Sequence, residues 1–163
     1  MANEFIKRAG EITEYTHENI EMLTKCMFDP IYFIRNFVKV QHPTRGNVPF
    51  DLYEYQEELI TACQENRWVI ALLARQSGKT ITISMYLLWY AMFNKDATIL
   101  IASKNNAHAI EIMDRIRHAY EELPKWLKAG VKYYNRHSIG FENGTTIRSE
   151  ATTEKTGRGL SIT

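Results

Sequence analysis

The residues with the clearest chemical potential are Gly78, Lys79 and Thr80, which follow an apolar run and open a helix-forming segment. An order of strand, loop and helix aims backbone N–H groups and the positive end of a helix dipole at a phosphate. In such a loop the lysine reaches the β- and γ-phosphates, and the next hydroxyl coordinates the Mg²⁺ that bridges them. The sequence therefore predicts a nucleoside triphosphate site at this loop.

The phosphate-loop motif is only half complete. Its full form, G-x-x-x-x-G-K-[ST], has a glycine where this chain has Leu73. Gly-Lys-Thr also occurs by chance at the starts of helices, which is the alternative to a nucleotide site. The flanking sequence favours the site, because residues 68–74 are typical of a strand buried on both faces and residues 81–90 continue as a largely apolar helix.

Composition predicts a folded domain with a hydrophobic core. Hydrophobic residues make up 45% of the 163 residues and charged residues 24%, which excludes a disordered chain. A net charge of +1 gives no overall basic character, so contact with nucleic acid would depend on a local patch. No apolar run reaches the length of a membrane span. Cys26 and Cys63 lie far apart without metal-ligand spacing, so we expect buried free thiols in a reducing compartment.

The elements that would position the loop are helices on both sides of it and a sheet. Helices are expected over residues 11–28, 30–38, 52–65 and 105–122, a loop over residues 42–47, and a second buried strand over residues 97–103. Two strand–helix units in succession predict an α/β fold with a parallel sheet flanked by helices. Near the C-terminus, Asn143-Gly144 between short alternating segments predicts a β-hairpin.

Several motifs occur here in a single order that resembles the N-terminal ATPase domain of tailed-bacteriophage large terminase subunits, of the T4-like type. The resemblance covers nearly the whole chain, and its main stretches are Phe33-Ile34-Arg35-Asn36-Phe37-Val38, His42-Pro43, Tyr55-Gln56, Ala74-Arg75-Gln76-Ser77-Gly78-Lys79-Thr80, Ala102-Ser103-Lys104 and Leu123-Pro124-Lys125-Trp126-Leu127. It implies a P-loop NTPase of the RecA/ASCE-like type that is incomplete at the C-terminus. Residues 1–50 would be a helical extension and residues 51–163 a partial ATPase core, without the Walker B region and the nuclease domain.

The resemblance also implies a function. Such proteins are ATP-driven motors that use ATP and Mg²⁺ to translocate double-stranded DNA into procapsids. Their partners are DNA, the phage portal protein, the small terminase subunit and further copies of the complete protein in a pentameric ring. They act in the host bacterial cytoplasm and are absent from the mature virion. A helicase-like P-loop translocase and a non-catalytic, terminase-derived interaction module are the alternatives.

By resemblance, Arg75 is the candidate arginine finger or phosphate sensor, catalytic together with Lys79, and Gln56 reads adenine. Nucleotide contacts are expected from Gln56, Ala74, Arg75, Gln76, Ser77, Gly78, Lys79, Thr80 and Ile81, with Thr80 also on the metal. A guanidinium offers a planar donor fork for phosphoryl oxygens, and an amide suits the N6/N7 edge of adenine. The residues alone leave other roles open: an ion pair for Arg75, a polar position on an amphipathic helix for Gln56, and either base stacking or a core position for Tyr55.

Carboxylates complete the chemistry of such motors. An aspartate at the end of a strand holds the Mg²⁺ and a glutamate activates water, but neither Asp96 nor Asp114 ends an apolar strand in the right place. We therefore expect weakened ATP binding and negligible hydrolysis by this chain alone.

Basic side chains supply two further hypotheses. Arg158, between two glycines, would contact phosphate or a neighbouring subunit, with a solvent-exposed loop as the alternative. Candidate contacts to a DNA channel are Lys125, Lys128, Lys132, Arg136 and Arg148.

Overall fold

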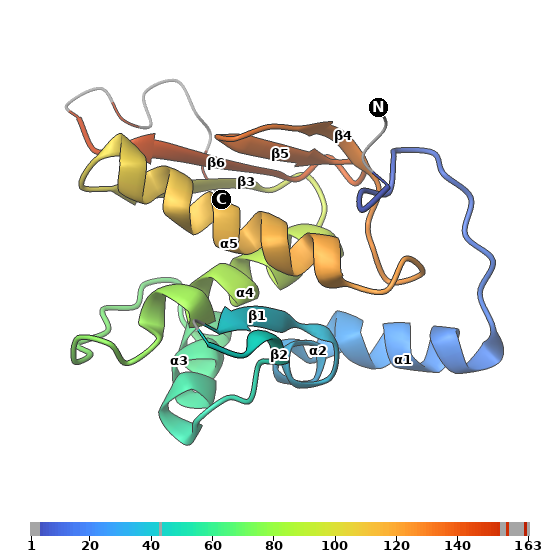
Figure 1. The fold of residues 1–163 in the computed structure, drawn as a ribbon, viewed down its shortest axis with the longest axis horizontal. Helices are drawn as coiled ribbons and strands as arrows, with labels where there is room; N and C mark the ends of the chain where they lie inside the picture. Colours follow the sequence, from blue (N-terminus) through green and yellow to red (C-terminus); the bar gives the residue numbers. More distant parts are fainter. Residues whose placement is uncertain (1–3, 43, 154–155, 157–161, 163) are drawn as a thin grey trace.

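The chain folds into α-helices and β-strands with a mixed sheet, as the computed structural model shows for residues 4–42, 44–153, 156 and 162 (Figure 1). In chain order the elements are α1 (His17–Phe28), α2 (Pro30–Phe37), β1 (Lys39–His42), β2 (Gly46–Pro49), α3 (Glu54–Glu65), α4 (Lys79–Phe93), β3 (Thr98–Ser103), α5 (Asn106–Glu122), β4 (Val131–Tyr134), β5 (Ser138–Phe141) and β6 (Thr146–Ala151). The expected α/β class is confirmed. No helix in the described part of the chain is long and apolar enough to cross a membrane.

The main sheet has four strands in the order β3-β6-β5-β4. β3 and β6 are parallel, with Thr98 opposite Thr146 and Ser103 opposite Ala151, whereas β5 is antiparallel to both β6 and β4. The sheet is thus mixed: the expected parallel pairing is found between β3 and β6, and the strands of the C-terminal hairpin add antiparallel pairs to the same sheet. α5 lies along one face of the sheet and packs on α4 beneath it (Figure 1).

The predicted hairpin near the C-terminus is confirmed, and its turn also fixes the end of α4. The Asn143 side-chain amide donates to the backbone carbonyls of Ala91, Met92 and Asn94 at 2.9, 3.2 and 2.7 Å. Carbonyls in the last turn of a helix have no partner within the helix. The turn between β5 and β6 therefore satisfies these carbonyls and joins α4 to the sheet.

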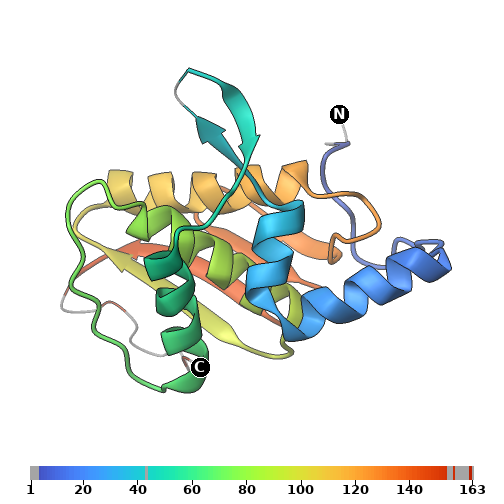
Figure 2. The ribbon, with the colours of Figure 1, turned by 90° about the horizontal axis from the view of Figure 1, so that it is seen from below.

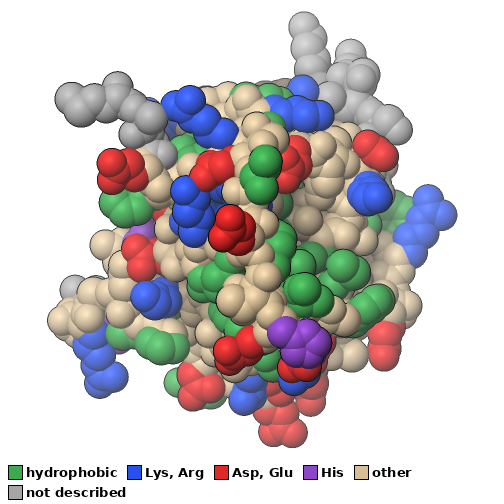
Figure 3. All heavy atoms as spheres, turned by 90° about the vertical axis from the view of Figure 1, so that its right-hand side faces the viewer, with side chains coloured by type: hydrophobic (Ala, Val, Ile, Leu, Met, Phe, Trp, Pro, Cys, Tyr) green, Lys and Arg blue, Asp and Glu red, His purple; other side chains and the backbone are tan. Residues whose placement is uncertain are grey.

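The N-terminal helices form where short side chains cap them. Thr16 Oγ1 accepts a hydrogen bond from Asn19 N, so α1 begins at His17 rather than at the expected residue 11. The N-terminal segment and α1 leave several hydrophobic side chains exposed, including Ile12 (93%) and Phe28 (76%). Figure 3, viewed from the side where α1 lies in Figure 1, shows hydrophobic side chains gathered among charged ones.

α1 and α2 attach to the core through α4. Phe33 and Ile34 of α2 are fully buried, and the indole Nε1 of Trp89 donates to the Cys26 carbonyl at 2.6 Å. Cys26 and Cys63 are both free, as predicted, although only Cys26 is fully buried. Burial raises the pKa of the Cys26 thiol to about 12.

A two-stranded hairpin replaces the expected loop between α2 and α3. β1 and β2 pair antiparallel with Lys39 opposite Pro49, and Figure 2 shows this hairpin projecting from the helical layer. His118 Nε2 lies 2.9 Å from Asn47 Oδ1 and ties the hairpin to α5. Most of its side chains are exposed. The sequence was not predicted to form strands, because it lacks the alternation of hydrophobic residues that is typical of a half-buried strand.

Residues 68–74, expected to be a buried strand, form neither a helix nor a strand. Trp68, Ile70 and Leu72 are 82, 92 and 95% exposed, and none of these residues takes part in either sheet. A strand is defined by hydrogen bonds to a neighbour, and β3 pairs only with β6 in the described part of the chain. The apolar run fits a buried strand in composition, but no neighbouring strand lies beside it here.

Glu142 anchors the segment that precedes α1 to the sheet. Its carboxylate accepts hydrogen bonds from Gly10 N at 3.0 Å and Gly130 N at 3.1 Å. These two bonds, led by that from Gly10, hold the pKa of the Glu142 carboxyl below its usual value.

Candidate functional site

The loop before α4 has the backbone shape of an anion-binding turn. Gln76 and Gly78 have positive φ angles of 63° and 72°, and Gly78 is the N-cap of the 15-residue α4 without any side-chain cap. Left-handed residues in such turns orient successive N–H groups toward one point. The N–H groups at the start of a helix carry partial positive charge, so the loop and α4 together favour an anion.

Three hydrogen bonds hold this loop in place. The Ser77 carbonyl accepts from Tyr55 Oη at 2.9 Å and from Gln56 Nε2 at 3.3 Å. Lys79 Nζ donates to the Ala74 carbonyl at 3.1 Å, which folds the lysine back across the loop. The first turn of α3 and the lysine itself thus fix the loop from opposite ends.

Ser77 and Arg75 of the loop have side-chain groups without partners among the described residues. The Ser77 hydroxyl is buried and has no hydrogen bond to any part of the chain that the structure describes. Arg75 is exposed, and no carboxylate in the described residues lies within 4 Å of it, so its predicted alternative as a structural ion pair is not observed there. A buried hydroxyl without a partner is costly, and a phosphate oxygen would satisfy it.

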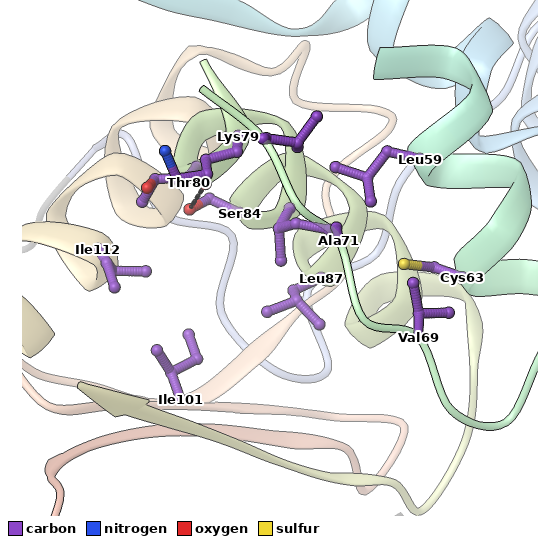
Figure 4. Close-up of a pocket in the computed structure, with 12 residues that line it drawn as sticks. Leu59, Cys63, Val69, Ala71, Lys79, Thr80, Ser84, Leu87, Ile101 and Ile112 are labelled. Atoms are coloured by element: carbon purple, nitrogen blue, oxygen red, sulfur yellow. Dashed lines mark hydrogen bonds between the residues drawn. The ribbon is translucent and has the colours of Figure 1, made fainter. Parts of the chain in front are cut away.

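An apolar cavity of about 350 Å³ adjoins the loop. Val69, Ala71 and Leu73 of the extended segment line it from one side, and it reaches to Ile101 of β3 and Ile112 of α5 (Figure 4). Lys79, Thr80 and Ser84 bring polar groups to its wall, and Cys63 lies on it. The cavity lies between residues 69–73, which pair with no strand in the described part of the chain, and β3, which pairs there only with β6.

The structure brings most of the predicted nucleotide contacts together. Gln56 of α3 meets the loop 74–80 although the chain separates them by about twenty residues. Thr80 follows Lys79 in the first turn of α4, the position that suits a metal bound to β- and γ-phosphates. Ile81 faces away from this cavity and lines a second one with β1 and α5. Arg158 lies outside the described residues.

Sequence reasoning missed the contact between α3 and the loop. Tyr55 was expected to stack on a base or sit in the core; instead its ring stacks on that of Tyr53 at 5.7 Å, and its hydroxyl holds the Ser77 carbonyl. Nothing in the sequence signals this contact, because it joins side chains and backbone far apart in the chain.

Two of the candidate DNA contacts have partners within the protein. Lys128 is 7% exposed and donates to the Phe5 and Glu121 carbonyls, both at 2.8 Å, and burial lowers the pKa of its ammonium. Lys125 forms an ion pair with Glu11. Lys132, Arg136 and Arg148 are exposed.

The loop fits a triphosphate better than it fits a metal by itself. In the described ranges no group of three His, Cys, Asp or Glu side chains is placed to bind a metal ion. Three features suit anionic oxygens: the start of α4, which has no side-chain cap, and the Ser77 hydroxyl and Arg75 guanidinium, which have no partner among the residues described. Any Mg²⁺ at Thr80 would therefore arrive with the phosphates.

A comparison with known protein families gives one match. Residues 70–161 match the family model described as "Terminase large subunit, T4likevirus-type, N-terminal". The matched segment spans more than half of the 163 residues and contains the loop, α4 and the main sheet. This chain therefore belongs to the family of T4-like terminase large subunits, and the match is to the model of their N-terminal region.

Proposed function

We propose that this chain is the ATPase part of a DNA-packaging terminase and that it binds ATP with Mg²⁺ at residues 74–80. The observation that carries the proposal is the shape of the loop. Two left-handed residues lead into an uncapped 15-residue helix, with Lys79 and Thr80 in its first turn. Backbone N–H groups, an ammonium and a hydroxyl then converge as phosphoryl-transfer sites require.

Each side chain of the loop has a proposed task. Lys79 Nζ exchanges its hydrogen bond with the Ala74 carbonyl for oxygens of the β- and γ-phosphates. The Arg75 guanidinium, free of carboxylates in the described part of the chain, neutralises charge on the γ-phosphate. Thr80 would hold the Mg²⁺, which supplies charge neutralisation across the two phosphates.

Hydrolysis by the chain alone is proposed to be negligible. Of the described residues that line the cavity beside Lys79 and Thr80, none carries a carboxylate. Activation of the attacking water normally requires a positioned base. Measurable ATP turnover by the purified chain that is lost on Lys79→Ala would refute this part of the proposal.

The assembly is proposed from the family. Membership implies a role in packaging, and the proposed partners are double-stranded DNA, the portal protein, the small terminase subunit and further copies in a pentameric ring. ATP hydrolysis in the assembled motor would drive translocation of the DNA in the host cytoplasm.

Calorimetric titration with a non-hydrolysable ATP analogue, with and without Mg²⁺, tests the site. We expect binding that weakens at least tenfold in Lys79→Ala, because a charge-assisted hydrogen bond contributes about 1.5–3 kcal/mol. Lys95→Ala is the matched control, since Lys95 is exposed just beyond the other end of α4.

Two results would contradict the proposal. Equal affinities of the wild type and Lys79→Ala would show that the ligand does not occupy this loop. Absence of binding by the wild type would favour the alternative of a non-catalytic interaction module.

A further inference from the structure

We propose that the face of the main sheet opposite α5, here called the open face, binds a single strand of DNA. One base stacks on Tyr133, and phosphates lie near Lys132 and Arg148. Binding at this face does not depend on the proposed ATP site, which lies at the start of α4. Only the choice of DNA over RNA rests on the proposed packaging function.

The main sheet has one face packed on a helix and one face that none of the described helices covers (Figure 1). α5 packs against β3 and β6. Side chains alternate between the two faces along a strand, and the buried row Ile99, Ile147 and Ile139 runs across three neighbouring strands. This row faces α5, so the residues that alternate with it point to the open face.

Tyr133 provides an aromatic ring on the open face. It pairs with Gly140 of β5, and its ring covers this glycine. A Cβ on Gly140 would overlap three ring atoms of Tyr133, namely Cδ1, Cε1 and Cζ, so a glycine is needed beneath the ring. The ring rests on the sheet in this way while 39% of the Tyr133 surface stays exposed. An exposed aromatic ring on a sheet is a stacking surface for an unpaired base.

A bulge in β4 brings a cation beside this ring. The pairing shifts between Val131, which lies opposite Phe141, and Tyr133, which lies opposite the preceding residue, Gly140. Lys132 is the extra residue of the bulge, so the regular alternation of side chains is broken here. Val131 is buried, whereas Lys132 and Tyr133 are both exposed. Two consecutive side chains thus reach solvent where a regular strand would turn one of them inward.

Two further cations border the open face. Arg148 of β6 lies opposite Ser138 of β5, two residues from Gly140, which corresponds to about 7 Å along the strand. Arg136 lies in the turn between β4 and β5. Lys132, Arg136 and Arg148 are all exposed, and none of them forms an ion pair with a described carboxylate.

The neighbouring carboxylates leave positive charge in excess. Glu150 follows Arg148 two residues later on β6 and is partly buried. Glu142, just after β5, accepts hydrogen bonds from Gly10 N and Gly130 N. Three exposed cations therefore face two carboxylates, one of which is already engaged by backbone donors. This balance favours a ligand with repeated negative charges.

A hollow of about 370 Å³ lies beside Arg148. Its lining includes His137 and Ser138 at the start of β5 as well as Arg148 itself. Guanidinium, imidazole and hydroxyl groups all donate hydrogen bonds to phosphate oxygens. The hollow and the ring of Tyr133 thus offer neighbouring places for a phosphate and a base.

A single strand fits these features better than a duplex or an acidic protein does. The bases of a duplex are stacked on one another, so a duplex would use the cations and leave the ring of Tyr133 without a ligand. An acidic protein segment brings carboxylates without a flat ring at each step. A single strand supplies a phosphate and an unpaired base together, and every base has a face that can stack.

Fluorescence anisotropy with a labelled oligo-dT strand of about 15 nucleotides tests the role of the ring. We expect Tyr133→Leu to weaken binding about 5- to 10-fold, the effect of losing one stacked base, because leucine covers Gly140 but has no ring. Tyr133→Phe keeps the ring and should bind within about twofold of the wild type. Tyr15→Leu is the matched control, since Tyr15 is similarly exposed in the segment before α1.

The salt dependence of the same binding tests the cations. We expect Arg148→Gln to reduce the slope of log affinity against log salt concentration by about 0.7, the value for one phosphate contact of a single strand. Arg45→Gln is the matched control, because Arg45 is exposed in the turn between β1 and β2. A duplex of the same length should bind more weakly than the single strand and should not respond to Tyr133→Leu.

Photocrosslinking of the wild type to a strand that contains 5-iodouracil gives a result that does not depend on the folding of any variant. We expect the adduct on Tyr133, located by mass spectrometry. An adduct on Tyr53 or Trp68 in place of Tyr133 would overturn the inference.

Three other results would also overturn it: no binding of the single strand, equal affinities of the wild type and Tyr133→Leu, or a duplex that binds as tightly as the single strand. All of these measurements are made without ATP. Failure of the ATP site would therefore leave them unchanged, and their failure would leave the ATP site standing.

Discussion

Substitution of Gly78 by alanine tests how tightly the loop and α3 fit together. The new methyl group meets two obstacles: a backbone φ of 72° and the Gln56 Nε2 atom at 2.6 Å. A non-glycine residue in the left-handed region costs about 1–2 kcal/mol. The substitution therefore destabilises the fold even before the contact with Gln56 is counted.

The contact adds a second contribution. Gln56 Nε2 is the end of a flexible side chain, but its amide is held by Tyr53 N and the Ser77 carbonyl. Moving it loses one or two hydrogen bonds of about 0.5–1.5 kcal/mol each. The expected total for Gly78→Ala is about 1.5–5 kcal/mol lost from the free energy of unfolding.

Gly46→Ala is the matched control. Gly46 has a φ of 70°, and nothing lies within 4 Å of its added Cβ, so this variant loses only the backbone contribution of about 1–2 kcal/mol. Urea denaturation followed by circular dichroism measures both values. The difference between them is the contribution of the contact with Gln56.

A double-mutant cycle completes the test. In a Gln56→Ala background the methyl group has room, so the penalty of Gly78→Ala should fall to that of Gly46→Ala. Equal penalties for Gly78→Ala and Gly46→Ala in the wild-type background, or a penalty that persists without the Gln56 side chain, would refute the reasoning.

Three further predictions concern stability and reactivity. The pKa of Glu142 is lowered in the folded state, so its carboxylate stabilises the fold above the unfolded pKa of about 4.5, and this stabilisation is lost as the pH falls through the folded pKa. Glu142→Gln should therefore lower the urea midpoint more at pH 7 than at pH 3. Equal shifts of the midpoint at the two pH values would contradict this prediction. Trp89→Phe removes the hydrogen bond to the Cys26 carbonyl and leaves a gap in the core. We expect it to lower the free energy of unfolding by about 2–4 kcal/mol. A decrease below about 0.5 kcal/mol would show that this contact contributes little to stability. Thiol labelling at pH 8 followed by mass spectrometry should give one adduct on the native chain, at Cys63 on the cavity wall. Cys26 should not react in the folded protein, because burial raises its pKa to about 12. A second adduct should appear only after unfolding.

The sequence predicted local structure well where the signal was local. The helix that follows the phosphate loop, the strand at residues 97–103 and the helix after it all lie within three residues of their expected bounds. The turn at Asn143-Gly144 was predicted from its residue types and is present. Each of these elements depends on periodicity, capping or turn chemistry within a few residues.

The sequence predicted β-strands less well, because a strand depends on a neighbouring strand to pair with. The apolar run at residues 68–74 has the composition of a buried strand, yet it lies unpaired beside a cavity. β1 and β2 pair with each other although their side chains are mostly exposed. Strand formation depends on a neighbour at hydrogen-bonding distance, which a single stretch of sequence does not specify.

The candidate site shows the same difference between features set by consecutive residues and features set by contacts between distant segments. Gly78, Lys79 and Thr80 are consecutive residues, so the sequence alone determined that an ammonium and a hydroxyl would stand at the start of a helix. Only the tertiary structure decided that the amide of Gln56 would donate to the Ser77 carbonyl. The physical reason is that a hydrogen bond between distant segments depends on how α3 packs beside the loop, and that packing is a property of the whole fold.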